Sequence, residues 1–252
     1  MRTYENKDEL KNEINKVKII FFDGTLLEMG KTEITPNMRK ALCSLKQNGI
    51  KICIATGRPF VTIPMFEGVV FDAILAFNGS FCTVGEQVVA KCPIPKEDVK
   101  KIIENAKRME RPVSIATAEE IVANGRDKDI EDYFAIAHHR VNVSEKFEEY
   151  LEKDVFQIML GCDLEERKYI LEGTKNAKLA AWWDRAVDII PKEGGKGTAI
   201  EQVLAHYKFS KEEAIAFGDG ENDMDMLLSV GKGIAMGNAA EKVKEIAADI
   251  CE

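Results

Sequence analysis

Three short apolar runs, each stopping abruptly at polar turn residues, constrain the fold of this 252-residue chain more than any other feature. They cover residues 17–22, 50–54 and 214–217, and they lead into Asp23, Thr56 and Asp219. Each run is apolar, β-prone and too short to form the apolar stripe of a helix. Each is therefore predicted to be a buried strand that opens into a turn.

Segments with a helical pattern separate these strands. Thr35 and Pro36 have the form of a helix start, with a side-chain cap followed by a proline at the first helical position. Residues 71–77 form a further predicted strand, and residues 239–248 a closing helix. Because strands and helices alternate, we predict an α/β fold with a Rossmann-like, doubly wound parallel sheet.

The middle of the chain has a different pattern. Residues 81–91 are predicted to form a hairpin around Gly85 and Glu86, and the chain up to residue 190 mixes further hairpins with helices. We therefore predict an inserted α+β cap. The predicted parts are a polar N-terminal extension of residues 1–16, a core domain of residues 17–80 and 191–252, and a cap domain of residues 81–190.

Composition excludes several classes of partner. The formal net charge is -8, and Lys and Arg are scattered among Asp and Glu, so we expect no nucleic acid partner. The six cysteines are dispersed without a C-x-x-C pair, which is typical of reduced thiols in a cytoplasmic protein. No apolar run approaches the ~20 residues of a membrane span, and the N-terminus lacks the apolar core of a signal peptide. We expect a cytoplasmic protein without a membrane partner, and these features do not predict its oligomeric state.

The run Gly-Asp-Gly-Glu-Asn-Asp at residues 218–223 is the strongest single candidate for a metal site. Asp219 and Asp223 lie four positions apart across a turn that enters a helix, with Asn222 between them. Mg²⁺ favours one or two protein carboxylates, several waters and a phosphate of the substrate. The alternative is an acidic helix N-terminus, which the helix dipole also favours.

Two other segments have features of an anion site. Thr56, Gly57 and Arg58 combine a hydroxyl with backbone N–H groups directly after a strand. Lys196 begins a predicted helix, where the helix dipole disfavours a cation unless an anion is bound nearby. This second segment is not a nucleotide P-loop, because Gly197 occupies the required Ser/Thr position and Ile190 the first glycine position.

Taken in order, these motifs resemble the haloacid dehalogenase superfamily, in its Cof-type sugar-phosphatase branch with a large α/β cap. The resemblance rests on Asp23-Gly24-Thr25, Thr56-Gly57-Arg58-Pro59, Lys196-Gly197 and residues 218–227, together with Asn78-Gly79 and residues 233–239. It implies a Mg²⁺-dependent phosphatase that acts on small phosphorylated metabolites such as sugar phosphates. The reaction would pass through an aspartyl-phosphate.

The resemblance also implies roles for individual residues. The catalytic residues would be Asp23, Thr56 and Lys196, and the metal would be held by Asp23, Asp219 and Asp223. The phosphorylated substrate would be bound by Thr56, Gly57, Arg58, Asn78, Gly79, Lys196 and Asn222. The cap would close over the site and select the leaving group.

The first motif departs from the family pattern D-x-D-G-T, because this chain has a single aspartate at that place. If Asp23 aligns with the second aspartate, Phe21 stands at the nucleophile position. If Asp23 aligns with the nucleophile, the second aspartate, a general acid and base, is missing. The sequence leaves both alignments open, and also the loss of two residues relative to a working enzyme. The alternative function is a catalytically impaired relative that binds Mg²⁺ and a phosphorylated ligand.

Overall fold

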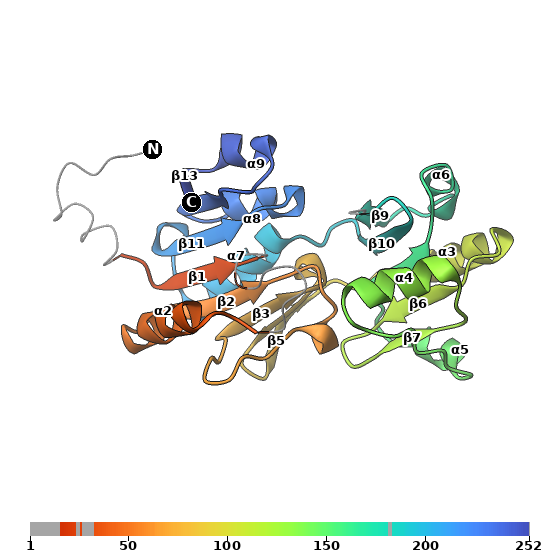
Figure 1. Cartoon of the computed structure of the whole chain (residues 1–252), viewed down its shortest axis with the longest axis horizontal. Helices are drawn as coiled ribbons and strands as arrows, with labels where there is room; N and C mark the ends of the chain where they lie inside the picture. Colours follow the sequence, from red (N-terminus) through yellow and green to blue (C-terminus); the bar gives the residue numbers. More distant parts are fainter. Residues whose placement is uncertain (1–15, 24–25, 27–32, 181–182, 252) are drawn as a thin grey trace. The chain divides into compact units, whose positions relative to one another are not determined.

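The computed structural model describes residues 16–23, 26, 33–180 and 183–251 (Figure 1). The predicted N-terminal extension lies, apart from Lys16, outside the described residues, as do Gly24 and Thr25 of the first motif. The chain forms two compact units. Of the described residues, those up to Gly57, in Pro64–Lys91 and from Gly195 onward form the core unit, and those in Arg58–Ile63 and Cys92–Gly194 form the cap unit.

The core unit is built on an eight-stranded sheet with the order β13-β12-β11-β1-β2-β3-β4-β5. Its six parallel strands are β1 (Ile19–Phe22), β2 (Lys51–Ala55), β3 (Ala73–Ala76), β11 (Ala214–Gly218), β12 (Lys232–Met236) and β13 (Asp249–Cys251). In the centre, Phe22 pairs with Ile54 of β2 and with Phe217 of β11. The predicted parallel α/β fold is confirmed.

Helices pack on both faces of this sheet because side chains of each strand alternate between the faces. Ile19 and Phe21 of β1 belong to one buried cluster with residues of α7 (Lys196–Tyr207) and α8 (Met224–Leu228). Ile20 and Phe22 belong to another cluster that includes Leu42 of α2 (Pro36–Gln47). The α2 helix lies beside β1 and β2 in Figure 1, and α9 (Glu241–Ile246) follows β12.

Two elements of the core unit match their local sequence signals. Thr35 caps α2 by accepting a hydrogen bond from the backbone N–H of Met38 at 3.2 Å, and Pro36 begins the helix. Residues 81–91 form the predicted hairpin, β4 (Phe81–Val84) and β5 (Gln87–Lys91). The hairpin belongs to the large sheet, however, because β4 pairs antiparallel with β3. The division between the units therefore falls after Lys91, and not after residue 80 as predicted.

The cap unit contains a five-stranded antiparallel sheet with the order β7-β6-β8-β10-β9. Its strands are β6 (Val113–Ala116), β7 (Ile121–Ala123), β8 (Gln157–Gly161), β9 (Ala177–Ala180) and β10 (Ala186–Pro191). Its helices are α3 (Lys96–Arg108), α4 (Lys128–Ile136), α5 (Phe147–Tyr150) and α6 (Arg167–Ile170). This unit has a hydrophobic core of its own, and the return to the core unit comes at Gly195 and not at residue 191 as predicted. Searched over the described residues, no helix has the length and apolar character that crossing a membrane requires.

Candidate active site

The three polar strand ends predicted from the sequence lie at one edge of the core sheet. Asp23 directly follows β1, and its backbone N–H donates to the carbonyl of Phe217 at 3.0 Å. Thr56 follows β2 and Asp219 follows β11, the two strands that flank β1. Asp23 would be paired with residue 55 of β2 and residue 218 of β11 if the registers continued, so Thr56 and Asp219 each lie one residue beyond the partner of Asp23. Ligands of open parallel sheets bind at this carboxyl edge.

A buried lysine joins two carboxylates at this edge. The ammonium of Lys196 donates to Oδ2 of Asp23 and to Oδ1 of Asp223. The side chains of Lys196 and Asp223 are fully buried, and that of Asp23 is 14% exposed. A charge removed from water is costly unless it is paired, so each of these groups depends on the others.

The electrostatics of the cluster follow from burial and from unequal pairing. Burial, reinforced by the nearby Asp223 charge, raises the pKa of Asp23 to about 7 despite the Lys196 ammonium. Burial alone would raise the pKa of Asp223 as well, but Lys196 and backbone N–H donors hold that pKa below its usual value. Burial alone would lower the pKa of Lys196, but the two carboxylates raise it. The ammonium is therefore charged, and of the two carboxylates Asp223 is the one that is more firmly ionised.

Protein donors occupy both oxygens of Asp223. While Oδ1 accepts from Lys196, Oδ2 accepts from the backbone N–H groups of Asp219 and Gly220, each at 2.9 Å. Asp219 is half-buried, and its carboxylate accepts from the side-chain amide of Asn238 at 3.2 Å. Asp223 thus connects the 218–223 turn to Lys196 through hydrogen bonds. The side chain of Asp219 is more exposed than that of Asp223.

Close backbone packing positions Lys196 at the start of α7. A Cβ atom at Gly79 would lie 2.4 Å from the carbonyl oxygen of Gly195, so only glycine permits this approach. The backbone N–H of Gly197 donates to Oδ2 of Asp225 at 3.0 Å. This carboxylate at the N-terminus of α7 interacts favourably with the helix dipole. The sequence reasoning missed Asp225, although its place two residues after Asp223 was a signal.

The turn after β3 connects the second strand end to the 218–223 turn. Asn78 has a left-handed backbone conformation (φ 55°), and Gly79 follows with φ 87°. The backbone N–H of Asn78 donates to the carbonyl of Thr56 at 2.9 Å. The side-chain oxygen of Asn78 accepts a hydrogen bond from the amide of Asn222 at 3.0 Å, and a Cβ atom at Gly57 would lie 3.2 Å from that oxygen. The sequence-predicted residues 56, 57, 78, 79 and 222 thus meet in one place.

Arg58 is the one predicted phosphate-binding residue outside the core unit. It begins the short segment Arg58–Ile63, which belongs to the cap unit. There its charge, together with the larger effect of burial, lowers the pKa of His139. The structure therefore groups Arg58 with residues of the cap, a placement that the motif at residues 56–59 did not predict.

The core cluster has the donor chemistry that Mg²⁺ requires. Among the residues that the structure describes, no three His, Cys, Asp or Glu side chains are arranged as a metal-binding group. Mg²⁺, however, needs only one or two protein carboxylates together with water and phosphate oxygens. Asp23 and Asp219 supply hard oxygen donors from adjacent strand ends. If ionised, the three carboxylates Asp23, Asp219 and Asp223 exceed the Lys196 ammonium by two negative charges, which a divalent cation would balance.

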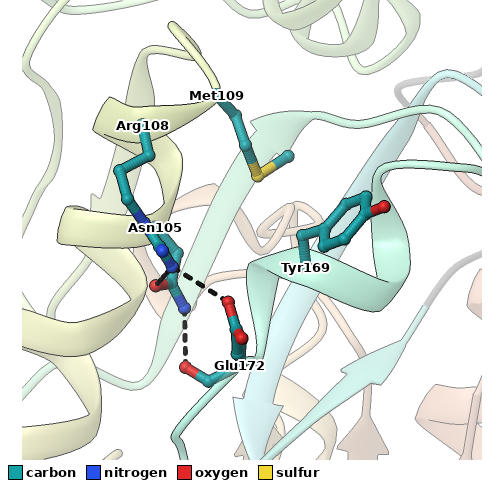
Figure 2. Close-up of a pocket in the computed structure, with 5 residues that line it drawn as sticks. All are labelled: Asn105, Arg108, Met109, Tyr169 and Glu172. Atoms are coloured by element: carbon teal, nitrogen blue, oxygen red, sulfur yellow. Dashed lines mark hydrogen bonds and ion pairs between the residues drawn. The ribbon is translucent and has the colours of Figure 1, made fainter.

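A separate surface pocket lies within the cap unit (Figure 2). It is lined by Asn105, Arg108 and Met109 at the end of α3, and by Tyr169 and Glu172. The amide of Asn105 donates to the backbone carbonyl of Glu172 at 2.9 Å, and Arg108 pairs with the Glu172 carboxylate at 3.1 Å. These polar groups bind one another and hold α3 to the segment around α6, so we assign this pocket a structural role.

The chain belongs to the haloacid dehalogenase-like hydrolases, whose family model matches residues 19–252. The resemblance found in the motifs is therefore confirmed. The chain is 32% identical to YkrA of Bacillus subtilis, with 91% of this chain and 90% of YkrA covered. It is 28% identical to 5-amino-6-(5-phospho-D-ribitylamino)uracil phosphatase YitU of the same organism, with 89% and 87% covered.

Among solved structures, the chain is similar to the haloacid dehalogenase subclass IIB sugar phosphatase BT4131. The two share a TM-score of 0.79 and 29% sequence identity, and the match covers 93% of each chain. The protein is thus an enzyme, a phosphatase-type hydrolase of the haloacid dehalogenase-like family.

Proposed function

We propose that this protein is a Mg²⁺-dependent phosphatase that releases phosphate from small phosphorylated metabolites, the class that includes sugar phosphates, through an aspartyl-phosphate on Asp23. The observation that carries the proposal is the contact of Asp23 with the buried Lys196 at the carboxyl edge of the sheet. The names of YitU and BT4131, both phosphatases of phosphorylated metabolites, support the substrate class.

In the proposed mechanism, the core residues bind and attack the phosphoryl group. An Asp23 oxygen attacks phosphorus, while the Lys196 ammonium offsets the charge that gathers on the attacking and phosphoryl oxygens. Thr56 binds the phosphoryl group from the next strand end, and Asn78 and Asn222 hold the two neighbouring turns together. Bound to Asp23 and Asp219, Mg²⁺ would supply further neutralisation of phosphoryl charge.

Asp223 receives a different role from the one predicted for it. The sequence placed Asp223 among the metal ligands, but both of its oxygens accept hydrogen bonds from protein donors. We therefore propose that Asp223 is a positioning residue that holds Lys196 and the 218–223 turn. Asp23 and Asp219 remain as the direct ligands of the cation.

The test is phosphate release from aryl, acyl and sugar phosphates with and without Mg²⁺, for the native chain and for Asp23→Asn. We expect release that requires Mg²⁺ and that Asp23→Asn abolishes, because the covalent route needs the carboxylate. Release that matches a metal-free blank for every substrate would contradict the proposal. Calorimetry would then test the alternative, since the single aspartate of the first motif favours an impaired relative that binds Mg²⁺ and a phosphorylated ligand without turnover.

A further inference from the structure

The helix that carries Lys196 begins without a cap of its own. α7 starts after Gly195, which has an extended backbone and no side chain that could accept a hydrogen bond. In most helices the side chain at this position accepts from the backbone N–H two or three residues later. Here the N–H two residues later, that of the buried Gly197, donates at 3.0 Å to Oδ2 of Asp225. Asp225 therefore supplies the cap from α8, another helix of the core unit.

Close packing explains why the cap comes from a residue distant in sequence. A Cβ atom at Gly195 would lie 2.6 Å from Oδ2 of Asp225, which is too short for two atoms that are not bonded. Among the described residues beyond the chain neighbours of Gly195, the Asp225 carboxylate is all that this Cβ atom would meet within 4 Å. A side chain at position 195 and the carboxylate of Asp225 therefore exclude each other, and this chain uses the carboxylate.

The start of α7 also packs against α8 beyond the cap. A Cβ atom at Gly197 would lie 2.5 Å from Oγ of Ser229 and 2.8 Å from the backbone oxygen of Asp225. The hydroxyl of Ser229 donates to that same backbone oxygen at 2.7 Å, so the two groups hold each other in place. The glycines on either side of Lys196 thus let its backbone lie directly against α8.

Two hydrogen bonds from adjacent residues tie α7 to the segment that carries the acidic turn. The side chain of Lys196 donates to Asp223, and the backbone N–H of the next residue, Gly197, donates to Asp225. The Lys196 ammonium also donates to Asp23, at the end of β1. Because the ammonium has to reach both carboxylates, a shift of the start of α7 would move it away from the position that the proposed mechanism requires.

We propose that Asp225 is a positioning residue for the phosphatase reaction, which caps α7 from α8 and thereby fixes where the Lys196 ammonium lies relative to Asp23. The inference rests on the proposed function and adds to it a residue that acts through Lys196. Misplacement of a catalytic group by about 1 Å can lower a rate by about 10²-fold. Loss of the Asp225 cap should therefore lower kcat by about 10–10²-fold.

The experiment measures kcat for nitrophenyl phosphate and acetyl phosphate at saturating Mg²⁺, together with thermal unfolding, for the native chain, Asp225→Ala and Asp225→Asn. Since Asp225 is exposed, its truncation leaves no buried cavity, and we expect both variants to fold. Asp225→Ala should lower kcat by about 10–10²-fold. Asp225→Asn keeps an acceptor oxygen and should stay within about 3-fold of the native chain, because Asn and Asp are similar as helix caps.

The matched control is Thr35→Ala, which removes the cap of α2, another helix of the core unit. Both alanine variants lose one helix cap, so the unfolding temperature should fall in each. Only Asp225→Ala should lose turnover, because α2 does not carry Lys196. An equal loss of kcat in Thr35→Ala would mean that turnover follows stability alone, and this result would overturn the inference.

A second pair of variants tests the same contact from the side of Gly195. In Gly195→Ala the added Cβ atom displaces the Asp225 carboxylate, so kcat should fall as it does in Asp225→Ala. Combined with Asp225→Ala, Gly195→Ala should cause no further loss, because the group that it displaces is already gone. Losses that multiply in the double variant would show that the two residues act independently, against the inference. Gly195→Ala also carries the test if Asp225→Ala does not fold.

The remaining outcomes separate the role of Asp225 from the proposed function. Native kcat in a folded Asp225→Ala variant, or an equal loss in Asp225→Asn, would overturn the positioning role and leave the phosphatase activity of the native chain standing. Absence of turnover by the native chain on every phosphate compound would instead overturn the proposed function, and the role of Asp225 with it.

Discussion

The ammonium of Lys196 contacts the carboxylate of Asp23, although the two residues are 173 positions apart in the chain. The contact joins the end of the first strand of the sheet to the start of α7, which follows the cap in sequence. Because the lysine is fully buried, its charge is compensated only by Asp23 and Asp223 among the described residues. In the proposed function, catalysis and the stability of the core therefore depend on the same three side chains.

Replacing Lys196 tests its contribution to stability and its contribution to catalysis by two separate measurements. In Lys196→Met, the buried carboxylates lose their cation, and we expect the free energy of unfolding to fall by roughly 3–5 kcal/mol. Phosphate release should fall by about 10²–10³-fold, because a donor to the developing charge is lost. Urea unfolding and kinetic assays measure the two effects. The control is Lys18→Met, whose 51% exposed side chain pairs with Glu213 and should contribute less than about 1 kcal/mol. Equal stability of the two variants would contradict the proposed dependence.

The close approach of Gly79 to Gly195 predicts a sharp difference between two glycine substitutions. Gly49 and Gly79 both have positive φ, +80° and +87°, but a Cβ atom at Gly49 would meet nothing within 4 Å. Gly49→Ala should therefore cost only the backbone strain, about 1–2 kcal/mol, and leave activity unchanged. Gly79→Ala should cost more and reduce kcat, because the start of α7 must move. Thermal unfolding and phosphate release test both variants, and matching behaviour would mean that the approach does not position Lys196.

Metal dependence should distinguish Asp219 from Asp223. Asp219→Asn removes a proposed ligand at a half-buried position, so we expect the Mg²⁺ concentration for half-maximal activity to rise by about 10–100-fold. Its stability should stay within about 0.5 kcal/mol of the native chain. Asp223→Asn should instead destabilise the protein by roughly 1–3 kcal/mol, since buried donors lose their acceptor. If Asp223→Asn were fully stable and responded only to added Mg²⁺, Asp223 would be a direct ligand, as the sequence predicted.

Asp72 should contribute to the acid sensitivity of the core unit. Burial alone would raise the pKa of Asp72, but Lys46, Lys51 and the backbone N–H of Ile52 hold it below 3.8. A carboxyl group with a lowered folded-state pKa stabilises the protein above its unfolded pKa, and the contribution is lost as pH falls through the folded pKa. Asp72→Asn should thus be destabilised by roughly 1.5–3 kcal/mol at pH 7.

The difference between the native chain and Asp72→Asn should shrink steadily below about pH 3.8, the unfolded-state value. Urea unfolding at a series of pH values measures this convergence. The control is Glu33→Gln, since Glu33 is 63% exposed and pairs with Arg39 at the surface, where the expected effect is under about 1 kcal/mol. A difference for Asp72→Asn that stays constant down to pH 2 would contradict the assignment.

Local sequence patterns were sufficient to predict the strands, helix cap and turn that surround the site. The apolar runs, the cap of α2 at Thr35 and the turn at Gly85 depend on neighbours within a few residues, so they could be read along the chain. The ends of the parallel strands could also be placed at a common edge, because parallel strands share their direction. The positions of Asp23, Thr56 and Asp219 followed from this rule.

Other features of the fold and the site could be established only from the tertiary structure. The sequence could not show that residues 81–91 extend the large sheet, since a hairpin has the same local pattern in either unit and only pairing with β3 decides its place. It left open whether Phe21 or Asp23 stands at the nucleophile position of the family motif. Burial of Phe21 and the contact of Asp23 with Lys196 favour Asp23 in the proposed function.

The sequence by itself determined the fold class, the family and most of the residues that gather at the edge of the sheet, because strand patterns and motif order are properties of the chain. Only the tertiary structure decided how those residues are paired. It showed Lys196 between Asp23 and Asp223, both oxygens of Asp223 occupied, and Arg58 grouped with the cap unit. Such pairings join residues far apart in the chain, and they depend on burial and on the competition of donors for each oxygen, which no local pattern records.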